Sequence, residues 1–251
     1  MKLHILSGGA AQGLVKALAG EFRNASGFDI DGTFGAVGAI RERLLAGAPA
    51  DVVILSDVMI ADLADAGHLA AGSRRDLGAV PTGIAVRAGD PVPDISNAAA
   101  LRDVLRSADA IYLPDPTKAT AGIHFAKVLH QLGAAADLTP RLKPFPHGQA
   151  AMAALAKHDS GAKHGGGTKH EGGTKHEGGR PIGCTQATEI LATPGVAYAG
   201  PLPHEFELST IYTAAVSGRS ANPDAARHFV EMLAAPASAA LRAELGFTTL
   251  S

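Results

Sequence analysis

Short β-like runs alternate with stretches of helical period along most of the chain, and this alternation constrains the fold more than any other feature. The runs are rich in Val, Ile and Leu and lie at residues 4–6, 51–55, 84–86, 110–113, 182–184 and 212–216. Apolar residues with the period of an amphipathic helix occupy 14–22, 37–44, 123–132 and 226–233. Asn222 and Pro223 suit the N-cap and first position of the last pattern, which continues through Leu241 and Leu245 to a C-capping Gly246. This order predicts an α/β protein with largely parallel sheets.

Composition narrows the possible partners. A chain of 251 residues, 46% of them hydrophobic, can bury a full core as one large domain or two small lobes. Its net charge of -2 gives no basic field for a nucleic acid or an anionic membrane surface, so neither is expected as a partner. No apolar run reaches the roughly 18 residues that span a bilayer. The single cysteine, Cys184, excludes an intrachain disulfide, and its apolar neighbours predict a buried thiol.

Residues 157–180 interrupt the alternation with a six-residue unit in tandem, KHDSGA, KHGGGT, KHEGGT and KHEGGR. So much glycine cannot offset the entropy of ordering, which predicts an expanded surface loop between a helix at 149–156 and the strand at 182. The alternatives that stay open are an engineered origin and a flexible Zn²⁺ or Ni²⁺ site formed by His158, His164, His170 and His176. We expect no resident metal and no cofactor.

Small-residue turns occur where a β-like run gives way to a helical pattern. They are Ser7-Gly8-Gly9, Gly35-Ala36-Val37-Gly38, Thr120-Ala121-Gly122 and His147-Gly148-Gln149. A helix N-terminus presents unpaired N–H groups and about half a positive charge, so it can hold an anion without a cationic side chain. The four turns together predict an anion site, although each glycine could also serve only its turn. No dinucleotide fingerprint, P-loop or nucleophile elbow is present in the sequence.

Several segments resemble the molybdate-binding proteins of ABC importers, within the type II periplasmic solute-binding superfamily. They are GTFGAVGAIRERLLAGAPADVVILSD, PDPTKATAGIHFAKVLHQLG, HGQAAMAAL, IYTAAVSG and NPDAARHFVEMLAAPASAALRAELGF, and they cover nearly the whole chain apart from the repeat. The resemblance implies a two-lobed α/β fold, each lobe a mostly parallel sheet flanked by helices. It also implies an oxyanion held in the cleft between the lobes by backbone N–H groups and hydroxyls.

By position, the resemblance implies a set of ligand contacts from both lobes. In the first lobe they are Ser7 with the Gly8 amide, and Ala36 with Val37; in the second they are Ala121, the Gly148 region and Tyr212. Gly35, from the turn itself, is expected to let the backbone approach the anion. Two departures stand out, because Ala36-Val37 replaces a turn that usually carries a hydroxyl, and Tyr212 is offset by about one position.

These departures favour an organic anion, because cationic and amide groups can pair with carboxylates. Lys118, Thr120, His124 and His147 lie on or beside the turns expected to form the cleft, and Thr185-Gln186 follows a strand expected to end there. A relative within this family acts as an aconitate isomerase. The alternative to a binding protein is therefore an isomerase of an unsaturated tricarboxylate, with His147 or His124 as the base that moves the proton. Each histidine could instead make a single structural hydrogen bond.

The expected organisation places residues 1–80 plus about 218–251 in the first lobe and residues 81–217, with the repeat, in the second. The chain is expected to cross between lobes near Pro81 and Thr82 and again after Gly200. The expected partners are the anionic ligand and an ABC importer membrane component, with the protein itself a monomer. The N-terminus shows no export signal, so the location is periplasmic if a signal peptide was removed and cytoplasmic if Met1 is the native start.

Overall fold

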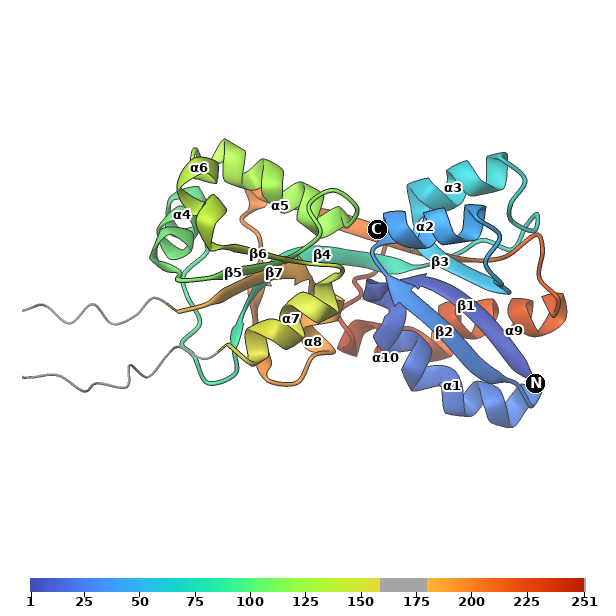
Figure 1. The fold of residues 1–251 in the computed structure, drawn as a ribbon. Helices are drawn as coiled ribbons and strands as arrows, with labels where there is room; N and C mark the ends of the chain where they lie inside the picture. The colour runs from blue at the N-terminus through green and yellow to red at the C-terminus, as the bar shows by residue number, and fades with distance from the viewer. Residues whose placement is uncertain (159–179, 251) are drawn as a thin grey trace, which may run out of the picture.

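The computed structural model describes residues 1–158 and 180–250, which fold into two lobes side by side (Figure 1). The repeat expected to form a loop at 157–180 lies outside these residues except at its ends. The strands are β1 Lys2–Gly8, β2 Asp29–Gly35, β3 Val52–Ser56, β4 Arg75–Arg87, β5 Ile111–Pro114, β6 Leu142–Phe145, β7 Ile182–Gln186, β8 Val196–Pro201 and β9 Ser209–Val216. The α-helices are α1 Gln12–Ser26, α2 Val37–Leu45, α3 Asp57–Asp65, α4 Ala98–Ser107, α5 Thr120–Gln131, α6 Ala135–Leu138, α7 Gly148–Ala156, α8 Ala187–Leu191, α9 Pro223–Ala234 and α10 Ala239–Glu244. Short 3₁₀ helices are η1 Gly9–Ala11, η2 Thr139–Arg141, η3 His204–Phe206 and η4 Pro236–Ser238.

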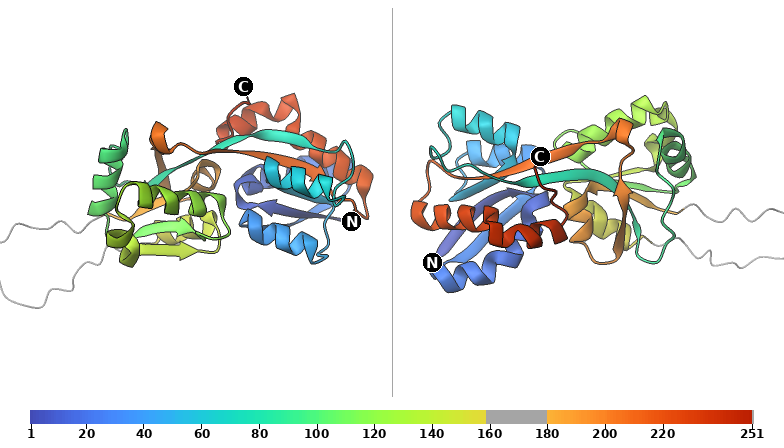
Figure 2. Two further views of the ribbon diagram at one scale, coloured as in Figure 1. Left: turned by 90° about the horizontal axis from the view of Figure 1, so that it is seen from above. Right: turned by 180° about the vertical axis from the view of Figure 1, so that it is seen from behind.

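The strands form a sheet in the order β2-β1-β3-β9-β4-β7-β5-β6, with β8 also paired to β4. Parallel pairs build the outer part of each lobe, β1 with β2 and β3 in one and β5 with β6 and β7 in the other. The pairs made by β4 and β9 are antiparallel. These two strands run in opposite directions along the junction of the lobes, and the elements of the second lobe lie between them in the chain (Figure 2).

The strand β4 belongs to both lobes. Residues Arg75 to Pro81 pair with β9, and residues from Thr82 onward pair with β7 and β8. The partner changes between Pro81 and Thr82, and the chain then continues into the second lobe.

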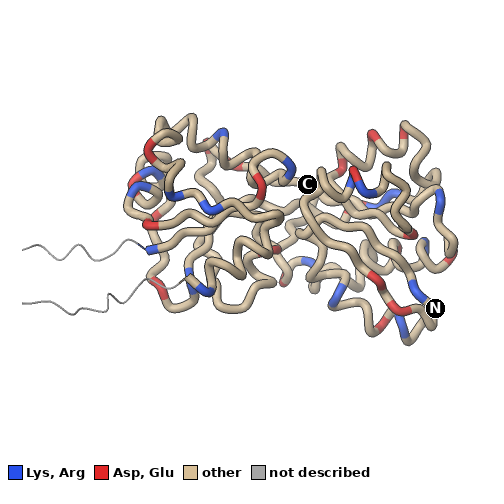
Figure 3. The backbone as a smooth tube through the Cα atoms, in the orientation of Figure 1, with Lys and Arg blue, Asp and Glu red and all other residues tan. Residues whose placement is uncertain are grey.

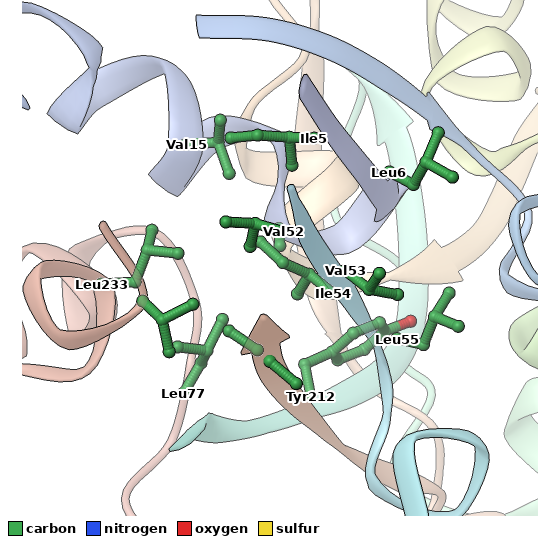
Figure 4. Packing of buried hydrophobic residues seen from close by; sticks show 14 of the residues in the cluster. Ile5, Leu6, Val15, Val52, Val53, Ile54, Leu55, Leu77, Tyr212 and Leu233 are labelled. Atoms are coloured by element: carbon green, nitrogen blue, oxygen red, sulfur yellow. The ribbon is translucent and has the colours of Figure 1, made fainter. Parts of the chain in front are cut away.

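Two main hydrophobic cores follow this division. The first packs α1, α2 and α9 against β1, β3 and β9, and Figure 4 shows Ile5, Val52, Ile54 and Leu233 meeting within it. The second packs α4 and α5 against β5 and β7, and a smaller cluster lies under α7. Because β9 contributes Tyr212, Ala214, Ala215 and Val216 to the first core, we propose that the second lobe ends near Leu208 rather than at residue 217.

Helices α1, α2, α5 and α9 form where the apolar period predicts them, whereas α3, α4 and α8 were not predicted. In α1 the residues Leu14, Val15, Leu18 and Phe22 are buried, and Gly27 with φ 75° ends the helix in the left-handed conformation. The last pattern is not one helix as expected. The helix α9 ends at Ala234 and Pro236 opens η4, because proline lacks the N–H that would continue the helical hydrogen bonds. The predicted cap at Gly246, φ 95°, follows α10.

Candidate anion site between the lobes

One small cavity lies where the two lobes meet, and the N-cap residues of four α-helices line it. These residues are Ala36 of α2, Ala119 of α5, His147 of α7 and Gln186 of α8. The lining is completed by Gly9, Ala10, Gly35, Val37, Pro114, Thr120, Ala121, Gly148, Glu189 and Tyr212. The cavity volume of about 20 Å³ is only slightly larger than one water molecule needs. A larger guest therefore requires the lobes to separate.

Three of these four helices begin without an N-cap side chain that accepts from their first turn, and two of the three have alanine as the N-cap. The N-caps Ala36 and Ala119 have extended backbones and no side-chain acceptor for the first N–H groups of α2 and α5. Alanine is a poor N-cap, so its use at both positions leaves the first-turn N–H donors without a side-chain acceptor, although the Gly38 N–H of α2 donates to the Lys118 carbonyl. Such donors, together with the positive end of each helix dipole, suit a small anion.

The lobes touch across the cavity. The N–H of Gly38 in α2 donates to the carbonyl oxygen of Lys118 at 3.2 Å, and Lys118 Nζ lies 3.0 Å from Glu42 Oε2. A Cβ on Gly38 would come 3.0 Å from the same carbonyl oxygen, which explains why glycine fits here. The lobes are therefore closed over the cavity.

A carboxylate of the protein itself occupies part of this site. Glu189 is 5% exposed, accepts a hydrogen bond from Thr185 Oγ1 at 2.5 Å, and accepts others from the backbone N–H groups of Gly148, Gln149 and Gln186. A Cβ on Gly148 or on Gly9 would overlap the carboxylate, so both glycines make room for it. Glu189 thus already uses the N-terminus of α7, and its two oxygens face elements of different lobes.

Burial raises the pKa of Glu189 to about 7, although its hydrogen bonds act in the opposite direction. Burial also raises the pKa of Tyr212, and the nearby Glu189 charge adds to this effect. The pKa of His147 is lowered by burial. The carboxyl group of Glu189 consequently changes its charge near neutral pH, whereas Tyr212 keeps its proton there and His147 is mostly neutral.

The amide of Gln186 has an open hydrogen-bonding position. Its Nε2 donates to Thr210 Oγ1 at 3.4 Å, while its Oε1 is buried with no partner among the described residues. Rotated by 180° about its last bond, the same amide would accept from Thr210 and turn two N–H donors toward a guest.

The structure brings together most of the residues expected at the site. Those that line the cavity are Gly35, Ala36, Val37, Thr120, Ala121, His147, Gly148, Gln186 and Tyr212. Ser7, Gly8 and Lys118 are not among the lining residues. The buried Ser7 hydroxyl donates to the carbonyl of Gly8, and a Cβ on Gly8 would collide with Val37. His124 also lies apart from the lining, with Nε2 2.8 Å from the carbonyl oxygen of Phe206.

The sequence reasoning missed Glu189, although a local signal was present. Glu189 is the third residue after the N-cap Gln186, which is the position from which a Glu in a capping box reaches back to the N-cap N–H. The sequence placed Thr185 and Gln186 at the cleft, where β7 ends, but did not include Glu189 in the first turn of the helix that follows.

Within the described residues, no helix is both long and apolar enough to cross a membrane. Across residues 1–158 and 180–250, no three His, Cys, Asp or Glu side chains gather as metal ligands would. Lysine, arginine and acidic residues are scattered over both lobes (Figure 3).

Two lobes closed over a cavity define a class, the two-lobed type II periplasmic binding proteins. The chain belongs to the family of bacterial extracellular solute-binding proteins, which matches residues 3–248. This confirms the resemblance to molybdate-binding-like proteins and the two-lobed α/β fold.

Individual relatives cover almost the whole chain. The aconitate isomerase of a Pseudomonas species is 28% identical over 237 residues, which is 92% of this chain and 82% of the relative. The molybdate-binding protein ModA of Escherichia coli K12 is 22% identical over 249 residues, 98% of this chain and 89% of that protein.

Solved structures share the fold. The periplasmic molybdate-binding protein of Azotobacter vinelandii has a TM-score of 0.76 at 19% identity, covering 99% of this chain and 100% of that one. The sulfate-binding protein SubI of Mycobacterium tuberculosis H37Rv has a TM-score of 0.69 at 18% identity, covering 100% and 88%.

Proposed function

We propose that this protein captures a small anion in the cavity between its lobes. The observation that carries the proposal is the convergence of four α-helix N-caps on one cavity, two of them alanines that leave backbone donors without a side-chain partner. The expected ligand is an oxyanion or a polycarboxylate, and closure of the lobes buries it. Relatives named for binding molybdate or sulfate support the ligand class.

The proposed setting is capture outside the cytoplasm and delivery to an ABC importer. The match to extracellular solute-binding proteins and to a substrate-binding domain of a putative molybdenum ABC transporter from Clostridium difficile supports it. The closed shape of the lobes is what a membrane component would recognise.

Calorimetry with molybdate, tungstate, sulfate, citrate and the two aconitates identifies the ligand class. The variant Ala36→Asp tests the site, because aspartate caps α2 well but places a carboxylate where the anion is expected. Its matched control, Ala36→Asn, has the same shape without the charge. We expect the aspartate variant to bind at least about 100-fold more weakly than the asparagine variant, since like charges in a closed site repel strongly. Equal affinities would place the ligand elsewhere.

A second candidate function is isomerisation of an unsaturated tricarboxylate. It is favoured by two groups that can exchange protons, His147 and Glu189, both lining the cavity, and by the similarity to an aconitate isomerase. Such a reaction removes a proton from the carbon beside the double bond and returns one at the far end of the allyl system.

Ultraviolet absorbance of trans-aconitate during incubation separates the two functions. Binding without turnover supports the capture protein. Turnover that is lost in His147→Ala but kept in His124→Ala supports the enzyme with His147 in the site. The His124 ring is expected to matter little, because it binds the Phe206 carbonyl outside the cavity lining.

A further inference from the structure

Glu189 is a negative group inside a cavity that otherwise suits negative ligands. Its carboxyl oxygens face Gly9 of the first lobe and Gly148 of the second, so closely that a Cβ at either position would overlap the carboxyl group. Nothing in the capture of an anion by helix N-termini calls for a buried carboxylate, which repels the ligand when it is ionised.

No cation among the described residues compensates this charge within the cavity. The lining holds backbone, apolar side chains, the hydroxyls of Thr120 and Tyr212, the imidazole of His147 and the amide of Gln186, and neither Lys nor Arg. Lys118 lies nearby but pairs with Glu42 at 3.0 Å. An anion that enters must therefore meet Glu189 either as a repelling carboxylate or as a neutral acid.

We propose that capture of an anion in this cavity takes up one proton, which resides on Glu189 and lets its neutral carboxyl group donate a hydrogen bond to the bound anion. The inference rests on the proposed function and adds that anion binding is coupled to the uptake of one proton. The balance is simple: the free protein, one solvent proton and one anion give the complex, and the single new covalent bond is O–H on Glu189. The ligand class is then an anion that accepts hydrogen bonds on several oxygens.

Other groups that pack around α8 do not titrate in the same range. They are His147 on the α7 side, Tyr212 on β9, Tyr198 on β8 and Cys184 on β7. Burial lowers the pKa of His147 and raises the pKa values of Tyr198, Tyr212 and Cys184. These four groups therefore keep their neutral forms between about pH 7 and about pH 9. The Glu189 pKa of about 7 falls at the edge of this interval.

The unpartnered amide of Gln186 is an independent sign that a guest belongs here. It is 3% exposed and lines the cavity, and its Oε1 has no hydrogen-bond partner among the described residues. A bound anion would accept from this amide in its rotated form while accepting from protonated Glu189.

The test measures the dissociation constant of the full chain as a function of pH. The probes are molybdate, sulfate and trans-aconitate, whose own charges stay constant between about pH 6.5 and about pH 9. We expect the constant to be nearly flat below the Glu189 pKa and to rise about tenfold per pH unit above it, because each complex then takes up a proton. Calorimetry at pH 8 in two buffers of different ionisation enthalpy counts this proton directly.

The variant Glu189→Gln keeps the shape of the side chain and cannot titrate. We expect it to bind the anion with a pH-independent constant and no proton uptake, and to bind more tightly than wild type at high pH. The control Glu21→Gln, on the exposed face of α1, keeps the wild-type slope.

The outcomes separate the two proposals. Binding of a probe with no proton uptake, or with the same slope in Glu189→Gln, overturns the inference and leaves anion capture standing. No binding of any probe at any pH overturns anion capture and the inference with it. Proton uptake that disappears only in Glu189→Gln supports both.

Discussion

At Glu189 two local effects act on one side chain. The third position of α8 directs its carboxylate back to the Gln186 N–H, a favourable cap for the ionised form. Packing of α8 against η1 and α7 removes water from the same group and raises its pKa from 4.5 to about 7. Because burial dominates, the ionised form of Glu189 costs the folded state free energy.

The variant Glu189→Gln is expected to stabilise the fold at pH 8 and to leave it unchanged near pH 4. The folded-state pKa lies above the unfolded value, so stability is full below pH 4.5 and falls as pH rises to about 7. Gln escapes this loss, which corresponds to a gain of about 3 kcal/mol above pH 7. Urea unfolding at the two pH values measures it, with Glu21→Gln as control. A variant less stable than wild type at pH 8 would show that the hydrogen bonds outweigh burial.

Gly148→Ala is expected to destabilise the protein by about 1–3 kcal/mol, because the added Cβ overlaps Glu189 and Thr185 Oγ1 and the packed site must shift. Gly20→Ala is the matched control within α1, where a Cβ would meet nothing within 4 Å. That change is expected to stabilise the helix by about 0.5–1 kcal/mol. Thermal melts compare the two variants. Equal effects would mean that the absence of a Cβ at Gly148 is not needed to accommodate Glu189 and Thr185.

At the scale of elements, Asp51 joins strands to the last long helix. Its Oδ2 accepts from the His4 N–H at 2.8 Å, and its Oδ1 accepts from Ser220 Oγ at 2.6 Å and the Asn222 N–H at 3.2 Å. Burial acts to raise the pKa of Asp51, but these hydrogen bonds outweigh it and hold the pKa below its usual value. One carboxylate thus fixes β1 and the segment that leads into α9.

Asp51→Ala is expected to cost about 2–4 kcal/mol, since three donors lose their acceptor. The contribution of Asp51 is present above the unfolded pKa of 3.8 and is lost as pH falls through its lower folded value. Denaturant unfolding should therefore show a smaller difference in unfolding free energy between wild type and Asp51→Ala at pH 3 than at pH 7. Asp103→Ala, an exposed residue of α4 whose ion pair is 4.0 Å long, is expected to change stability by less than about 1 kcal/mol. A similar loss in both variants would contradict the role of Asp51.

The elements that the sequence predicted are those whose apolar residues are buried in a regular pattern. The strand β3 is buried along its whole length and was predicted from its Val and Ile run. The strands β6 and β8 were missed, because their residues are mostly partly exposed and carry no such pattern. The glycine turns at the helix starts were predictable, because each lies between a β-like run and a helical pattern in the sequence. Glu189 was not, because its burial depends on η1 and α7, which are distant in sequence.

At the scale of the whole molecule, the closed state depends on contacts between lobes. The Gly38 N–H and the Lys118 carbonyl form one of them at 3.2 Å. The side-chain pair Lys118 and Glu42 forms another, but both groups are 47% exposed or more. The backbone contact is therefore expected to govern closure, and the ion pair to contribute little.

Gly38→Leu is expected to hold the lobes apart, because its side chain must displace the Lys118 carbonyl. A smaller closed population weakens the apparent affinity for the ligand in proportion. Small-angle scattering should show a larger radius of gyration than in Gly20→Leu, the same change on exposed α1. An unchanged radius and affinity would exclude the contact as a determinant of closure.

Lys118→Met distinguishes a ligand contact from a surface pair. As a partner of Glu42 alone, Lys118 is expected to change the ligand's affinity by less than about fivefold. A far larger loss of affinity would show that Lys118 contacts the ligand, as expected from the sequence.

The strand β4 enters the sheets of both lobes without a break. Loss of either sheet removes half of the partners of that strand and weakens the other sheet at once. The two halves of the protein are therefore expected to melt as a single cooperative unit, although each has its own core.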